Sequence, residues 1–165
     1  FVLAGLTLGC SAEELDPQLE STSLKGTLTE KNADAVRRPF KFKGEGVFTT
    51  DFNTTICPGL AQLTIDGTGQ ASHLGKFTVH LDWCTNQADI NYATGTQIAA
   101  NGDELYFELR TFTVGEEFDV AVYDYSGGTG RFENARGEVT ERLTYYPIDE
   151  FTMGYLNEGT GWLSY

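Results

Sequence analysis

The sequence alternates apolar and polar residues over many short segments, and this alternation restricts the fold more than any other feature. In residues 76–83, which read KFTVHLDW, the apolar face carries Phe77, Val79, Leu81 and Trp83. A period of two residues is typical of a half-buried β-strand. No window of the sequence shows sustained helical periodicity. The pattern therefore predicts an all-β protein.

The alternating segments predict strands at residues 24–30, 40–48, 60–66, 76–83, 89–96, 104–112, 118–125, 138–145, 151–156 and 161–165. In residues 118–125 we expect Phe118, Val120 and Val122 to share the apolar face. Antiparallel strands hide their edges best when the sheet closes on itself. We therefore expect a single antiparallel closed β-barrel of about eight strands, with an open sandwich as the alternative.

Glycines suggest where the strands bend or end. Asn101 followed by Gly102 favours a tight hairpin turn. Residues 67–69, which read GTG, predict another turn, and Gly44 with Gly46 predicts a bend or a bulge.

Residues 127–137 read GGTGRFENARG and place four glycines around a short helix-compatible step between two predicted strands. The segment resembles the GGTG-x-F-x-x-A-x-G signature of the allene oxide cyclase and dirigent family of small β-barrels, which have a calycin-like architecture. The matching residues are Gly127, Gly128, Gly130, Phe132, Ala135 and Gly137. We interpret them as a sharp strand connection that caps the barrel. Within the same architecture, a lipocalin-like barrel is the alternative.

A second stretch, residues 67–75 (GTGQASHLG), resembles the G-x-G-x-x-x-x-L-G segment of small bacterial barrel lipoproteins of unknown function. Both signatures concern structure, so neither brings a catalytic residue with it. The family resemblance implies a barrel interior with a few polar groups, which dirigent-like proteins and allene oxide cyclases use to shape the cyclisation or coupling of apolar substrates.

The first nine residues, FVLAGLTLG, are apolar and too few to span a bilayer as a helix. They are typical of the end of a signal-peptide hydrophobic region. The segment LTLGC resembles a bacterial lipobox of the looser kind found in Bacteroidota, with Thr7 where leucine is usual, which implies a lipidated Cys10. A buried cysteine in a first strand is the alternative. We expect a signal remnant at 1–9, the lipidated cysteine and a flexible tether at 10–23, and the barrel at 24–165.

The chain has 24 acidic and 11 basic residues and a net charge of −13, which argues against DNA or RNA as a partner, because phosphate binding needs a basic face. An exported compartment permits disulfides. Cys57 and Cys84 flank a candidate hairpin with its midpoint between Gln70 and Ala71, so a regular register sets the two cysteines nearly opposite each other. This favours a disulfide, and two separate buried thiols are the alternative.

The sequence predicts neither a metal site nor a cofactor. His73 and His80 are the only histidines, and they lack the closely spaced ligands of a zinc site. The glycine runs lack the Lys-Ser/Thr of a phosphate-binding loop. We expect His73 to make a structural hydrogen bond at a turn, with catalysis as the alternative, and His80 to face solvent.

Polar residues on the predicted strands form a candidate ligand site: Tyr106, Glu108, Arg110, Asp119, Tyr123 and Glu141. Glu141 lies beside Val139 and Leu143 on an otherwise apolar face. If that face points inward, the carboxylate needs a partner such as Arg110, or its pKa rises. The alternative is that these charges face water outside the barrel.

We therefore expect an exported, lipid-anchored β-barrel of the bacterial cell envelope, either periplasmic or surface-exposed. Its predicted partners are the membrane and a small apolar ligand or another protein. Binding is favoured over catalysis, and a cyclase or dirigent-type enzyme acting on an apolar substrate is the alternative. A surface-display module is the third possibility.

Overall fold

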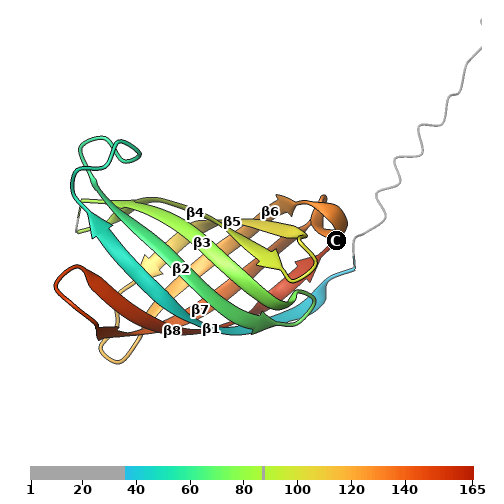
Figure 1. Cartoon of the computed structure of the whole chain (residues 1–165). Helices are drawn as coiled ribbons and strands as arrows, with labels where there is room; N and C mark the ends of the chain where they lie inside the picture. The colour runs from blue at the N-terminus through green and yellow to red at the C-terminus, as the bar shows by residue number, and fades with distance from the viewer. Residues whose placement is uncertain (1–35, 87) are drawn as a thin grey trace, which may run out of the picture. The chain divides into compact units, whose positions relative to one another are not determined.

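The computed structural model describes residues 36–86 and 88–165, which form one closed β-barrel (Figure 1). Its elements are β1 (Arg38–Asp51), β2 (Ala61–Ala71), β3 (Gly75–Thr85), β4 (Ile90–Ala99), β5 (Glu104–Thr113), β6 (Asp119–Gly128), the 3-10 helix η1 (Gly130–Phe132), β7 (Arg136–Pro147) and β8 (Thr152–Ser164). Each strand pairs antiparallel with the next, and β8 pairs with β1. The predicted all-β closed barrel of eight strands is confirmed.

The up-and-down order divides the strand connections between two ends of the barrel. The connections β1–β2, β3–β4, β5–β6 and β7–β8 lie at one end, which we call the open end. The remaining three connections and the C-terminus lie at the other, which we call the closed end (Figure 1). All eight strands lie between Arg38 and Ser164. The predicted strand 24–30, the predicted segments 1–9 and 10–23, and Cys10 lie outside the described residues.

The segment 127–137 caps the closed end, as predicted. It forms the β6–β7 connection and contains η1, which places the fully buried Phe132 side chain inside the closed end of the barrel. The Phe132 ring packs edge-on against Tyr165, with 5.0 Å between ring centroids. Fully buried Phe40, Leu105 and Leu163 complete the apolar plug. Gly130 has a φ of 55°, a left-handed conformation that favours glycine.

The predicted turn at residues 67–69 is wrong, because β2 continues unbroken through them. The β2–β3 turn lies instead at residues 72–74, where His73 has a φ of 73°. Gly67 is required for packing. A Cβ atom there would lie 2.7 Å from the Glu45 carbonyl oxygen and closer still to the Tyr155 hydroxyl. Of the bend or bulge predicted at Gly44 and Gly46, the bulge does not occur, since β1 pairs there with both neighbours without a shift of register.

The two segments predicted at 151–156 and 161–165 form one strand, β8, which pairs with β1 and β7. The residues between them, Asn157 to Thr160, are polar or small and give no strand signal in the sequence. A Cβ atom at Gly159 would overlap the Phe42 ring. Here too the glycine makes room for an aromatic side chain that points inward.

His73 makes the structural hydrogen bond that the sequence predicted. Its Nε2 lies 3.0 Å from the Pro39 carbonyl oxygen, and the Tyr165 hydroxyl lies 3.3 Å from its Nδ1. The ring also stacks on Phe40. His73 therefore links the β2–β3 turn to the start of β1 and to the C-terminal residue.

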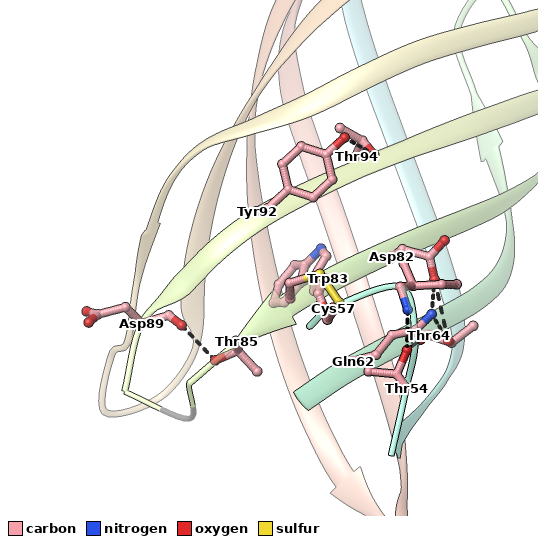
Figure 2. The surroundings of a disulfide bond; sticks show 12 residues. Thr54, Cys57, Gln62, Thr64, Asp82, Trp83, Thr85, Asp89, Tyr92 and Thr94 are labelled. Atoms are coloured by element: carbon pink, nitrogen blue, oxygen red, sulfur yellow. Dashed lines mark hydrogen bonds between the residues drawn. A yellow bond between two sulfur atoms is a disulfide. The ribbon is translucent and has the colours of Figure 1, made fainter. Parts of the chain in front are cut away.

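A disulfide joins Cys57 and Cys84, whose Cα atoms are 5.4 Å apart. The expected register was wrong, because Cys84 pairs with Gln62 across the β2–β3 hairpin. Cys57 belongs to the β1–β2 connection, which turns back over the outer face of the barrel. Figure 2 shows the hydrogen bonds that hold this connection, from Thr54 to Gln62 and from Gln62 to Asp82. The disulfide therefore fastens an open-end loop to the barrel wall.

Candidate functional site

The barrel encloses a cavity of about 740 Å³ that extends from the open end toward the plug. This volume is within the usual range for sites that bind small molecules. Phe52, Ala88 and Val114, which come from three different connections, lie at its mouth, and Phe42, Gln97 and Tyr125 line its deep part. We call this space the barrel cavity.

Aromatic side chains make up much of the cavity wall. Three edge-on ring pairs stand along it: Phe48 with Tyr145 at 5.7 Å, Trp83 with Phe112 at 5.3 Å, and Phe107 with Tyr123 at 5.2 Å between centroids. Each pair joins two different strands, so each ring is held in place by a ring from another strand. The wall is thus a preformed apolar surface with separate polar groups set into it.

Glu141 is the only buried acidic side chain in the described part of the chain, with 4% of its surface exposed. It lies in the middle of β7 and lines the barrel cavity. Its Oε1 accepts a hydrogen bond from Asn157 Nδ2 on β8, and the Tyr123 hydroxyl on β6 also bonds to it. Burial raises the pKa of Glu141 to about 7, although both hydrogen bonds act in the opposite direction.

Four tyrosines surround this carboxyl group. Tyr125 donates a hydrogen bond to Gln97 Oε1 at 3.1 Å, and Tyr145 shares a hydrogen bond with Asp119 near the mouth. Burial raises the pKa values of Tyr123, Tyr125, Tyr145 and Tyr155 above the ordinary tyrosine range. These hydroxyls therefore remain protonated at neutral pH and can donate hydrogen bonds to a ligand.

Four of the six predicted ligand-site residues border the barrel cavity: Asp119, Tyr123 and Glu141 line its wall, and Arg110 lies at the edge of its mouth. Tyr106 and Glu108 are exposed on the outer face of β5, because the inner face of that strand is occupied by Leu105, Phe107 and Leu109. The expectation that they share a site with Glu141 is therefore wrong. A ligand-binding role for the three cavity residues stays a prediction.

Arg110 is not the partner of Glu141. It lies where the β5–β6 register shifts, at the edge of the mouth, and its guanidinium turns to the outer face. There its Nε lies 2.7 Å from Asp124 Oδ2, and its Nη1 lies 2.6 Å from Glu138 Oε2. A raised pKa is the second possibility that the sequence predicts for Glu141, and the structure agrees with it.

The inner face of β6 is the opposite of the one predicted. Ala121, Tyr123 and Tyr125 are buried inside, whereas Val120 and Val122 are half-buried on the outside. Register decides this, because Tyr123 pairs with Val139, which is fully buried on the inner face of β7. The sequence prediction followed hydrophobicity and preferred valine over tyrosine.

Further cavity residues were missing from the predicted site: Gln97, Tyr145, Tyr155 and Asn157. The alternation of β7 already placed Tyr145 on the face of Glu141 and so could have identified it. Asn157 could not be found, since it lies in the stretch that was not predicted to be a strand. Gln97 lies just beyond the strand predicted at 89–96, and the neighbouring residues on its face, Gly95 and Ala99, are small.

Two absences concern the described residues alone. Within 36–86 and 88–165, no group of three or more histidine, cysteine, aspartate or glutamate side chains is arranged to hold a metal ion. The same residues contain no helix long and apolar enough to cross a membrane.

Comparisons with solved structures find the same architecture in two proteins described as pterocarpan synthase dirigent proteins. The protein GePTS1 superposes with a TM-score of 0.52 and 16% sequence identity, covering 79% of this chain and 86% of its own. The protein PsPTS1 superposes with a TM-score of 0.54 and 14% identity, covering 79% of this chain and 96% of its own. The chain has a dirigent-like barrel fold. No family model and no curated protein matches the sequence.

Proposed function

We propose that this dirigent-like barrel binds a small apolar or amphipathic ligand in the barrel cavity. The observation that carries the proposal is the cavity itself, about 740 Å³ of space inside a barrel whose other end is sealed by Phe132 and its neighbours. An interior that served only stability would be filled with side chains, because close packing maximises dispersion contacts. Apolar surface left unfilled in this way is typical of ligand sites.

Filling the cavity tests the proposal. Ala93 lines the cavity on the inner face of β4, and the next residue, Thr94, points to the outer face. A ligand that binds only the folded protein stabilises it by about 2.7 kcal/mol when the ligand concentration is a hundred times the dissociation constant. We expect members of a broad apolar panel to raise the melting temperature of the native protein and of Thr94→Trp, but not of Ala93→Trp. If no compound stabilises the native protein, or if Ala93→Trp responds equally, ligand binding in the cavity is refuted.

We further propose that the protein is exported and anchored by lipid at Cys10 in the bacterial cell envelope. The lipobox-like segment LTLGC supports the anchor, and the Cys57–Cys84 disulfide is compatible with an oxidising compartment. Radiolabelled palmitate should enter the native protein expressed in a bacterium and should not enter Cys10→Ala. Label that persists in the variant would contradict the anchor.

A cyclase or dirigent-type activity is the second candidate function. It is favoured by Glu141, whose pKa of about 7 would let it give and take a proton at neutral pH inside an apolar cavity. The Tyr123 hydroxyl beside it can donate a hydrogen bond to an oxygen of the substrate. Mass spectrometry of recovered ligand separates the two functions: a binding protein returns its ligand unchanged, whereas an enzyme returns a product and Glu141→Gln does not.

A further inference from the structure

The charges that line the barrel cavity are almost all of one sign. Glu141 lies in its middle, and Asp119 and Asp89 lie toward the mouth. Among the described residues, no lysine or histidine lines the cavity, and the one arginine that does, Arg110, directs its guanidinium to Asp124 and Glu138 on the outer face. The interior therefore contains acidic groups without a cation to neutralise them.

Within residues 36–86 and 88–165, Glu141 has hydrogen-bond donors but no positively charged partner. Asn157 and Tyr123 are both neutral, and the tyrosines around them remain neutral as well. Removing a carboxylate from water is unfavourable unless an opposite charge compensates for the lost solvation. The strongest available compensation would be a cation brought in by the ligand.

The aromatic wall would favour the same cation. Tyr123, Tyr155 and Phe107 line the cavity together with Glu141. The face of an aromatic ring attracts a cation, and this attraction increases when water is excluded. A carboxylate among aromatic rings is a suitable environment for an organic ammonium group and an unsuitable one for a carboxylate ligand.

The entrance has the same electrostatic character. The four open-end connections, residues 52–60, 86–89, 114–118 and 148–151, contain no lysine or arginine. Their acidic residues are Asp89, Glu116, Glu117, Asp149 and Glu150. Acidic groups around an opening attract cations and repel anions before they enter.

We propose that the ligand of the barrel cavity is an apolar amine, bound with its hydrocarbon part against the aromatic wall and its ammonium group against Glu141. This inference rests on the proposed function, since it names the chemical class of ligand for the same cavity. The ammonium group supplies several N–H donors, so it can pair with the Glu141 carboxylate without removing the hydrogen bonds from Asn157 and Tyr123.

Three naphthalene derivatives of nearly equal shape test the charge preference in the full chain: 2-naphthylmethylamine as the cation, 2-naphthylmethanol as the neutral analogue and 2-naphthoate as the anion. Isothermal titration calorimetry at pH 8 would give their dissociation constants. We expect the amine to bind at least about tenfold more tightly than the alcohol, which corresponds to about 1.4 kcal/mol, and the carboxylate to bind most weakly.

Two matched variants identify the group responsible. Glu141→Gln removes the inner carboxylate, and Glu138→Gln removes an exposed carboxylate from the outer face of the same strand. The amine preference should disappear in Glu141→Gln, with alcohol binding unchanged, and should persist in Glu138→Gln. If the native protein binds the alcohol as tightly as the amine, or if Glu141→Gln retains the preference, the inference is overturned while ligand binding stands. If none of the three compounds binds, the proposed function fails as well.

A measurement on the native protein keeps the test independent of folding in the variants. The charged ligand requires ionised Glu141, so its affinity should increase by up to about tenfold per unit between about pH 5 and pH 7 and then level off. The facing groups Tyr123, Tyr125, Tyr145 and Tyr155 do not ionise in this interval, because burial raises their pKa values. Asp119, which bonds to Tyr145, and Asp89 are the other lining carboxylates. An amine affinity that parallels that of the alcohol across this interval would refute the role of Glu141.

Discussion

Glu141 should make the stability of the barrel depend on pH in the opposite sense from an ordinary salt-bridged carboxylate. Its pKa is about 7 in the folded state, against 4.5 for a glutamate side chain exposed to water. The unfolded state therefore loses its proton first as the pH rises. The folded state is relatively destabilised from about pH 4.5 upward, and the full effect is reached above about pH 7.

The size of this effect follows from the difference between the two pKa values. This difference corresponds to about 3 kcal/mol when both states are ionised. At pH 5 only about 1 kcal/mol of this penalty is present, and at pH 8 nearly all of it. Glu141→Gln removes the titration and retains an oxygen that can accept from Asn157. The stability of the variant relative to the native protein should therefore increase by about 2 kcal/mol between pH 5 and pH 8.

Urea unfolding at pH 5 and pH 8, followed by tryptophan fluorescence with the disulfide intact, measures this difference. Trp83 lies inside the cavity wall and reports on loss of the core. Glu138→Gln is the control, because Glu138 is exposed on the outer face of β7, and its difference from the native protein should stay small at both pH values. If the relative stability of Glu141→Gln is the same at pH 5 and pH 8, the carboxyl group is not held in a desolvated state and the reasoning is wrong.

Three further perturbations have defined outcomes. Replacing Cys84 by alanine opens a loop with a sequence separation of 27 and should lower the unfolding free energy by about 3.5 kcal/mol; a loss under about 1 kcal/mol in urea unfolding would show that the loop is held by other contacts. Gly67→Ala should destabilise the barrel by about 1–3 kcal/mol, because the added methyl group overlaps the Tyr155 hydroxyl and the backbone of β1. The loss of stability should be smaller in a Tyr155→Phe background. Equal losses in both backgrounds would exclude the hydroxyl as the cause. Phe132→Ala should cost about 3–5 kcal/mol by leaving a void in the plug, and a calorimetric loss near zero would contradict the sealed end.

Much of the barrel could be predicted because strand alternation is a local property. The apolar face of residues 76–83 lies inside the barrel, and so does the face that contains Val139, Glu141 and Leu143. The segment 127–137 was correctly interpreted as the cap. Its glycines allow the sharp turn and Phe132 fills the space beneath it. Both features can be recognised within one short segment of the sequence.

The glycines within strands show where local interpretation fails. A glycine can mark a turn, or it can make room for a side chain from elsewhere, and the two are indistinguishable in sequence. Gly67 makes room for Tyr155, which is 88 positions away, and Gly159 makes room for Phe42. The stretch around Gly159 was therefore left out of the predicted strands. Asn157, the hydrogen-bond partner of Glu141, lies in that stretch and was missed.

By itself, the sequence determined the all-β class, the barrel and the placement of a carboxylate on an apolar strand face. These follow from a period of two residues and from the need to close sheet edges. The tertiary structure alone decided that Tyr123 points inward, that Cys57 reaches Cys84 through a loop, and that Arg110 turns outward. Each of these depends on how separate segments pair or pack against one another, which the pattern within a single segment does not contain. The same long-range packing desolvates Glu141, which is why the raised pKa and the candidate site appear only in the folded barrel.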